Sequence, residues 1–153
     1  MTTSVEGRFR RPEPRVHHQV MSDPASRSDG RLRVLVVDAD DRVRESLTGL
    51  LAIGDHVLVV GSAGLADAAL DLAAAHRPDI VVLDPRLPEV DGGLSFMAAL
   101  RSRCPDVRIL AMSWSDALEG PALGGGADAF VRKTFRPTEL IAAIVAAARP
   151  AGA

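Results

Sequence analysis

Several polar residues with complementary chemistry stand at the ends of short apolar runs. Asp38 and Asp84 each follow such a run, Ser113 closes a third, and Lys133 follows a fourth. Two carboxylates, with Asp40 as a further candidate, make an oxygen-rich site that suits a hard cation such as Mg²⁺. An ammonium and a hydroxyl beside them would bind phosphate oxygens. A carboxylate beside a cation, an ammonium and a hydroxyl can act as a nucleophile and become an acyl phosphate.

The run that precedes Asp84 predicts the element that positions it. Residues 80–83 are four consecutive aliphatic residues, too few for a helix and too evenly apolar for a half-exposed strand. This pattern is typical of a strand buried on both faces of a parallel sheet. Pro85 and Pro88 end the strand, which places Asp84 at the carboxyl edge of the sheet, where open α/β sheets bind ligands.

The rest of the chain alternates between strand and helix patterns. We expect strands over 33–37, 57–60, 80–83, 107–112 and 129–132, and helices behind the capping candidates Asp40 and Asp41, over 65–76, over 94–103 and from Pro137 onward. Leu65, Ala69 and Leu72 should form the buried side of the second helix. Between strands four and five, Gly120, Pro121 and residues 124–126 predict only a short or frayed helix and a mobile region.

Five strands with crossovers predict an α/β fold of one domain. We expect a doubly wound, five-stranded parallel sheet in the flavodoxin-like order 2-1-3-4-5 over residues 31–149. Residues 1–30 should form a disordered tail and residues 150–153 a short C-terminal tail. In this order strands one and three are neighbours, so Asp38 and Asp84 should converge.

Composition narrows the classes of function. A net charge of −2 and an aromatic fraction of 3% argue against direct binding to nucleic acid. Cys104 is the only cysteine, and no apolar run approaches the roughly 20 residues that cross a bilayer, so we expect a cytoplasmic protein without membrane contact. Lys133 is the only lysine among 18 basic residues, and its compact charge suits a carboxylate or phosphate oxygen in a tight site.

These residues carry a family resemblance. Residues 33–148 resemble the receiver domain of two-component response regulators in element order, spacing and motifs. Residues 82–92, Val-Leu-Asp-Pro-Arg-Leu-Pro-Glu-Val-Asp-Gly, look like the phosphoacceptor strand and the turn after it, and residues 126–133 look like the fifth strand and its lysine. The sequence of these motifs is most similar to that of receivers that carry a C-terminal helix-turn-helix. Because the chain stops soon after residue 148, we expect a stand-alone receiver.

The resemblance implies roles for individual residues. Asp84 would accept phosphate from a sensor histidine kinase or a phosphotransfer protein, and Lys133 would bind the phosphoryl group. Ser113 would be the switch hydroxyl and Phe130 the switch aromatic. The metal ligands for Mg²⁺ would be Asp38, Asp84 and the main-chain carbonyl of Arg86, with Asp40 as a candidate. A receiver of this kind is not itself an enzyme; its output would pass through protein–protein contacts with an unidentified target, and a homodimer is an open option.

Departures from the family pattern keep a second hypothesis open. Ala39 stands where the family has its second acidic residue, which contacts Mg²⁺ directly, and a methyl group offers no ligand. Trp114 follows Ser113 where the family prefers a small residue, and a bulky indole would narrow the entrance to the site. Both favour an atypical receiver that binds proteins without phosphorylation.

A third hypothesis is an enzyme. Asp38, Ala39 and Asp40 after an apolar strand fit the Asp-x-Asp opening of phosphatases of the haloacid dehalogenase type, with Asp38 as nucleophile and Asp40 as acid/base. The motif is short, the usual Gly-Thr does not follow it, and it leaves the Asp84 motif unexplained, so this hypothesis is remote.

Overall fold

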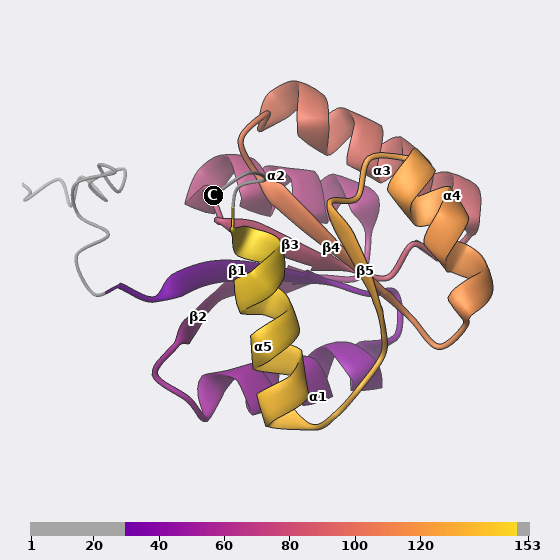
Figure 1. Ribbon diagram of the computed structural model, residues 1–153. Coiled ribbons are helices and arrows are strands. Elements are labelled where there is room, and N and C mark those ends of the chain that lie inside the picture. The colour runs from indigo at the N-terminus through magenta and orange to yellow at the C-terminus, as the bar shows by residue number, and fades with distance from the viewer. Residues whose placement is uncertain (1–29, 150–153) are drawn as a thin grey trace, which may run out of the picture.

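The computed structural model describes residues 30–149, in which five strands alternate with helices (Figure 1). The elements are β1 (Leu32–Val37), α1 (Asp41–Ala52), β2 (Val57–Ala63), α2 (Ala66–His76), β3 (Ile80–Leu83), α3 (Val90–Arg103), β4 (Arg108–Ser113), the 3₁₀ turn η2 (Asp116–Leu118), α4 (Glu119–Gly124), β5 (Ala129–Arg132) and α5 (Pro137–Ala148). The tails expected over residues 1–30 and 150–153 fall, apart from Gly30, outside the described residues.

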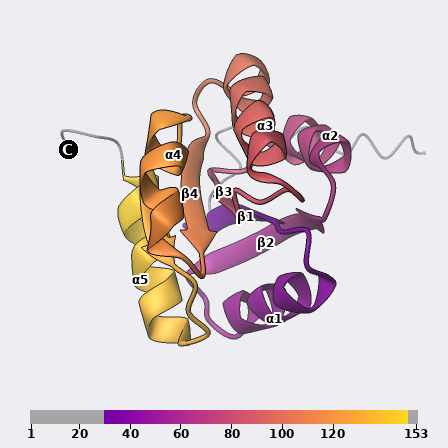
Figure 2. The ribbon, with the colours of Figure 1, turned by 90° about the vertical axis from the view of Figure 1, so that its right-hand side faces the viewer.

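All strand pairs of the sheet are parallel, and the strand order is β2-β1-β3-β4-β5. This confirms the predicted α/β class and topology. Helices α1 and α5 cover one face, and α2, α3 and α4 cover the other (Figures 1 and 2). One core cluster lies under each helical layer, because alternate side chains of β1, β3 and β4 point to opposite faces of the sheet.

The central strand β3 has the expected bounds and is buried along its whole length. All four of its residues are at most 2% exposed, since β1 and β4 flank it and helices cover both faces. Such double burial explains why the sequence shows an unbroken aliphatic run here in place of an alternating one. The strand thus forms a rigid base for Asp84, which directly follows it.

Strand β2 is longer than expected, running three residues past Val60 to Ala63. Its pairing with β1 shifts register: Val34 pairs with Val59 and Leu35 with Gly61, so Val60 has no partner on β1. Gly61 weakens the sequence signal for a strand. The pairing with β1 overrides that weak local preference.

Helix α3 begins at Val90, four residues before the expected start at Leu94. The sequence pattern is misleading here because Gly92 and Gly93 are poor helix formers. In the structure they serve close packing: a Cβ atom at Gly93 would lie 1.7 Å from the carbonyl oxygen of Pro85, and one at Gly92 would lie 2.2 Å from that of Leu87. The glycines therefore let α3 pack against the loop that follows Asp84.

Two further expectations concern α2 and the stretch after β4. The predicted buried side of α2 is wrong in part: Leu65 precedes the helix and is 70% exposed, and Leu72 is only partly buried. Ala69, Leu70 and Ala73 form the buried face. The expected short helix after β4 is confirmed as one 3₁₀ turn followed by the six-residue α4. Within residues 30–149, no helix has the length and apolar character needed to cross a bilayer.

Candidate functional site

The sheet brings the predicted site residues to one edge. Asp38 and Asp84 directly follow β1 and β3, which are neighbours, Ser113 is the last residue of β4, and Lys133 directly follows β5. Backbone hydrogen bonds extend the strand pairing into the loops. The amide of Asp84 donates to the carbonyl of Val37 at 3.0 Å, and the amide of Lys133 donates to that of Ser113 at 2.9 Å.

Lys133 bridges the two carboxylates. Its Nζ lies 2.7 Å from Asp38 Oδ2 and 2.5 Å from Asp84 Oδ2. The side chains are almost enclosed: Lys133 is 3% exposed, Asp38 4% and Asp84 11%. Burial disfavours the charged ammonium, but the hydrogen bonds and charges of both carboxylates outweigh it and raise the pKa of Lys133 above its usual value. The ammonium is therefore held in its charged form, and the three groups together carry a formal charge of about −1.

Backbone amides orient both carboxylates. Asp38 Oδ1 accepts a hydrogen bond from the amide of Asp40 at 2.9 Å, and Asp84 Oδ1 accepts one from the amide of Arg86 at 2.9 Å. Each aspartate thus bonds the chain two residues further on, a local turn that fixes its rotamer. The remaining oxygen of each then points at Lys133.

Arg44 supports Asp38 from α1, a contact that the sequence analysis missed. Its Nη1 donates to the main-chain carbonyl of Asp38 at 2.7 Å, and its Nη2 pairs with Asp41 at 2.5 Å. A Cβ atom at Gly64 would lie 2.5 Å from the guanidinium, so glycine makes room for it. Nothing in the apolar spacing of α1 marks the contact of Arg44 with Asp38, because the acceptor is a backbone carbonyl outside the helix.

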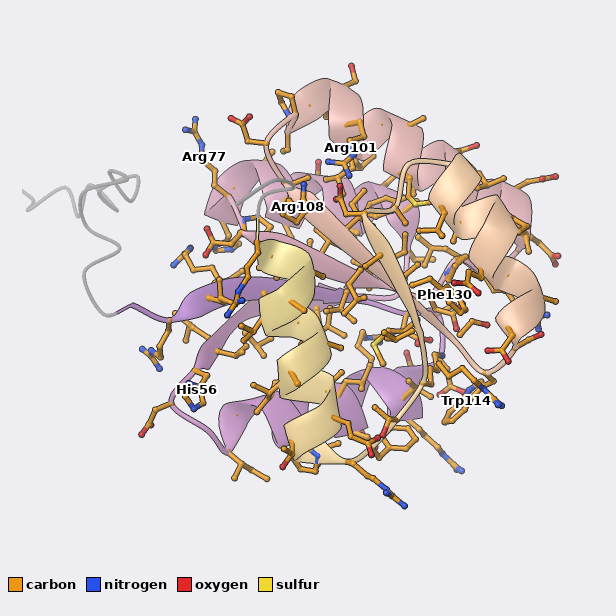
Figure 3. All side chains as sticks on the ribbon, in the orientation of Figure 1. His56, Arg77, Arg101, Arg108, Trp114 and Phe130 are labelled. Carbon is orange, nitrogen blue, oxygen red and sulfur yellow. The ribbon has the colours of Figure 1, made fainter. Side chains whose placement is uncertain are left out.

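Ser113 and Phe130 have contacts of their own beside the Lys133 bridge. The Ser113 side chain is buried, and its Oγ accepts from the amide of Ser115 at 3.2 Å, which leaves the hydroxyl proton available for donation. Phe130 on β5 is partly buried and packs against the core cluster beneath α3 and α4. Figure 3 shows Phe130 between β5 and α4, with Trp114 further out at the rim.

The donor set fits Mg²⁺ in its chemistry. Two carboxylates, from Asp38 and Asp84, and the main-chain carbonyl of Arg86 are hard oxygen donors, and Mg²⁺ commonly takes one or two carboxylates and keeps several waters. Asp40, the further candidate, is occupied otherwise: its Oδ1 caps α1 by accepting from the amides of Arg42 and Val43. Across residues 30–149, no three acidic, histidine or cysteine side chains are grouped to share a metal ion. Ala39 is exposed and contributes no donor.

An aromatic pair adjoins Lys133. Trp114 is 53% exposed and Phe135 42% exposed, and their ring centroids lie 5.5 Å apart with the planes tilted by 48°. The Nζ of Lys133 lies 5.4 Å from the centre of the Trp114 ring, within the range of a cation–π contact. Phe135 was not singled out from the sequence, although its place two residues after Lys133 was a usable signal.

Comparison with known proteins identifies relatives of this chain and its fold. Residues 34–145 match the family model for the response regulator receiver domain. The response regulator MprA of Mycobacterium sp. (strain KMS) is 40% identical over 113 residues, which are 72% of this chain and 48% of that protein. The probable transcriptional regulatory protein NarL of Mycobacterium tuberculosis is 37% identical over 121 residues, 78% of this chain and 56% of that protein.

The solved structures include a matching domain. The signal receiver domain of the putative response regulator NarL from Mycobacterium tuberculosis superposes with a TM-score of 0.70 at 37% identity, covering 77% of this chain and 96% of that one. The chain spans about half the length of the curated relatives it matches.

Proposed function

The chain belongs to the family of response regulator receiver domains of two-component signalling, and on that premise we propose that Asp84 accepts a phosphoryl group from a sensor histidine kinase or a phosphotransfer protein. The observation that carries this proposal is the bridge of Lys133 between Asp38 and Asp84. It keeps a charged ammonium within reach of any group bonded to Asp84. Asp84 is also the most exposed of the three side chains, as a residue that meets a donor must be.

The transfer step follows from these contacts. A carboxylate oxygen of Asp84 attacks the phosphorus of the donor phosphohistidine. A new O–P bond forms while the N–P bond breaks, and its electron pair returns to the imidazole nitrogen. Lys133 keeps its contact with Asp38 and exchanges its contact with Asp84 for a phosphoryl oxygen. The hydroxyl of Ser113 donates to another phosphoryl oxygen, using the proton that its bond with Ser115 leaves available.

The cation belongs to the same proposal. Asp38, Asp84 and the carbonyl of Arg86 would hold Mg²⁺, and Asp40 is not assigned to it because its carboxylate caps α1. When bound, the cation neutralises negative charge where the phosphoryl group meets the carboxylates. The chain's own groups then orient Asp84, through the amide of Arg86, and hold Asp38, through Arg44.

Phosphorylation would pass its signal on by changing the protein surface around α4 and β5. Ser113 and Phe130 sit on β4 and β5, on either side of the short helix α4 in the chain. Movement of Ser113 toward a phosphoryl group would repack Phe130 and the short η2–α4 segment, a small change that a protein partner can recognise. We propose a cytoplasmic protein target, without direct contact to nucleic acid or membrane.

Intact-mass spectrometry after incubation with acetyl phosphate and Mg²⁺ tests the proposal. We expect the added mass of one phosphoryl group, its loss in Asp84→Asn, and its retention in the matched control Asp55→Asn, an exposed aspartate outside the site. An adduct that survives in Asp84→Asn would overturn the assignment. So would its absence from the unmodified chain in the presence of a cognate kinase.

A second candidate is supported by Ala39 and by the capping role of Asp40. The site holds one carboxylate fewer than the family pattern, which weakens Mg²⁺ binding and favours a module that binds proteins without phosphorylation. An unmodified chain that gains no phosphate, together with an Ala39→Asp variant that does, would favour this candidate. The phosphatase hypothesis gains no support, because Asp40 is engaged as a helix cap and Asp38 is bound to Lys133.

A further inference from the structure

Trp114 and Phe135 are the least expected feature of the site edge. Large aromatic side chains are usually buried, yet these two rings come from separate loops, after β4 and after β5, and meet at the surface. Their ring centroids are 5.5 Å apart. Two half-exposed rings that contact each other form a continuous apolar wall, since each shields part of the other from water.

Polar contacts hold both loops in place. The carbonyl of Trp114 accepts from Nη2 of Arg132 at 3.2 Å, and Arg132 also pairs with Asp116 at 3.6 Å. On the other loop, Thr134 Oγ1 bonds Glu139 at 3.1 Å and accepts from the amide of Arg136 at 3.1 Å. The loops that carry the rings are thus tied to neighbouring residues by polar contacts.

The Trp114 ring lies beside the ammonium group of Lys133. Lys133 extends from a strand end at the surface, yet only 3% of its side chain is exposed, and the Trp114 ring centre is 5.4 Å from its Nζ. The same Nζ pairs with the carboxylates of Asp38 and Asp84, at 2.7 and 2.5 Å. The indole and the two carboxylates together surround an ammonium that is almost shut off from solvent.

We propose that Trp114 and Phe135 form an aromatic cover that limits the access of small solutes to Lys133 and Asp84. This inference rests on the proposed phosphoacceptor function for its consequence at Asp84. A small acyl phosphate must pass the cover before Asp84 attacks its phosphorus and the acyl carboxylate leaves with the electron pair.

The cover also slows hydrolysis. Loss of the phosphoryl group requires water oxygen to bond to phosphorus while the bond from phosphorus to Asp84 breaks and restores the carboxylate. The proton of the water passes to the phosphate or to solvent. Excluding water from the Lys133 side lengthens the life of the acyl phosphate, and the same cover slows its formation from small acyl phosphates.

Amine labelling tests the cover without any phosphorylation. Lys133 is the only lysine, so peptide mapping after treatment with an acetylating N-hydroxysuccinimide ester reports on one side chain apart from the chain terminus. We expect Trp114→Ala to acetylate at Lys133 roughly tenfold faster than the unmodified chain, a factor equivalent to about 1.4 kcal/mol. Phe135→Ala should show a smaller increase, and Trp114→Phe should stay near the unmodified rate because a ring remains opposite Phe135.

Two controls separate a cover from a purely structural role. Ile53→Ala removes an exposed apolar side chain at the far end of α1 and should leave the labelling rate unchanged. The urea midpoint of Trp114→Ala should match that of the unmodified chain, since a half-exposed ring adds little to the core. Equal labelling of Lys133 in Trp114→Ala and the unmodified chain would overturn the cover.

Acetyl phosphate then tests the consequence at Asp84. We expect Trp114→Ala to gain and to lose the phosphoryl group several-fold faster, in line with the labelling factor. Faster labelling with unchanged phosphoryl kinetics would overturn the control of access to Asp84. Faster labelling with no phosphate on any variant would support the cover over Lys133 and refute the phosphoacceptor function instead.

Discussion

Replacing Lys133 with methionine removes the charge that bridges the carboxylates while keeping the length of the side chain. The ammonium lies 2.5 and 2.7 Å from the two oxygens, so each pair attracts by about 6 kcal/mol at an effective dielectric constant of about 20. Desolvation of three nearly buried groups offsets much of this attraction. Removing one partner of such a buried group lowers the free energy of unfolding by about 3–5 kcal/mol, because the remaining charges lose their counter-charge.

Urea unfolding followed by far-ultraviolet circular dichroism measures this loss. The variant Lys133→Met should unfold at a much lower urea concentration, while Arg136→Met, which breaks an ion pair whose side chains are 82% and 57% exposed, should change the free energy of unfolding by less than about 1 kcal/mol. Adding Asp38→Asn to Lys133→Met should restore part of the lost stability, since it removes one of two unpaired carboxylates. A stabilising bridge at Lys133 is refuted if Lys133→Met costs no more than Arg136→Met, or if Asp38→Asn costs as much in the variant as in the unmodified chain.

Three further expectations follow from the site and its supports. The raised pKa of Lys133 stabilises the fold fully below its unfolded-state pKa of about 10.4, and the contribution is lost as pH rises through the higher folded-state pKa; the urea midpoint should therefore fall above about pH 10.4, and this fall should be absent in Lys133→Met. The chain has no tyrosine and no other lysine to mask the effect. Ala39→Asp should lower the thermal midpoint without Mg²⁺ by adding a like charge, and millimolar Mg²⁺ should raise it more than in the unmodified chain. Gly93→Ala should destabilise by at least about 2 kcal/mol in urea because its Cβ would meet the carbonyl of Pro85, whereas Gly120→Ala, with open space around it, should be neutral or stabilise by up to about 1 kcal/mol.

The sheet could be predicted from the sequence because its signals are local. Residues 80–83 and 129–132 have the expected strand bounds, and α5 begins at the expected Pro137. Parallel strands with crossovers leave few topologies open, so the order of the strands followed from their number and spacing. The convergence of Asp38 and Asp84 is a consequence of that order, and the structure places both beside Lys133.

The rest depends on contacts between distant segments. Neither the extension of β2 to Ala63 nor the start of α3 at Val90 could be predicted, because glycines weaken the local pattern and pairing or packing overrides it. The role of Arg44 depends on the space at Gly64, twenty positions away in the sequence. Phe135 could not be recognised as part of the site because its ring contacts Trp114, which lies on a different loop.

The register shift between β1 and β2 also affects how the domain meets other proteins. Strand β2 lies at one open edge of the sheet, and the unpaired Val60 forms an irregularity of the kind that bends an edge strand away from a flat ladder. The opposite edge, β5, has only four residues and ends with the exposed charge of Arg132. Short, bent or charged edges resist the addition of a strand from another chain. Recognition of this domain by other proteins is thereby left to the side chains of its helices and loops, and the sheet stays protected from backbone-mediated aggregation.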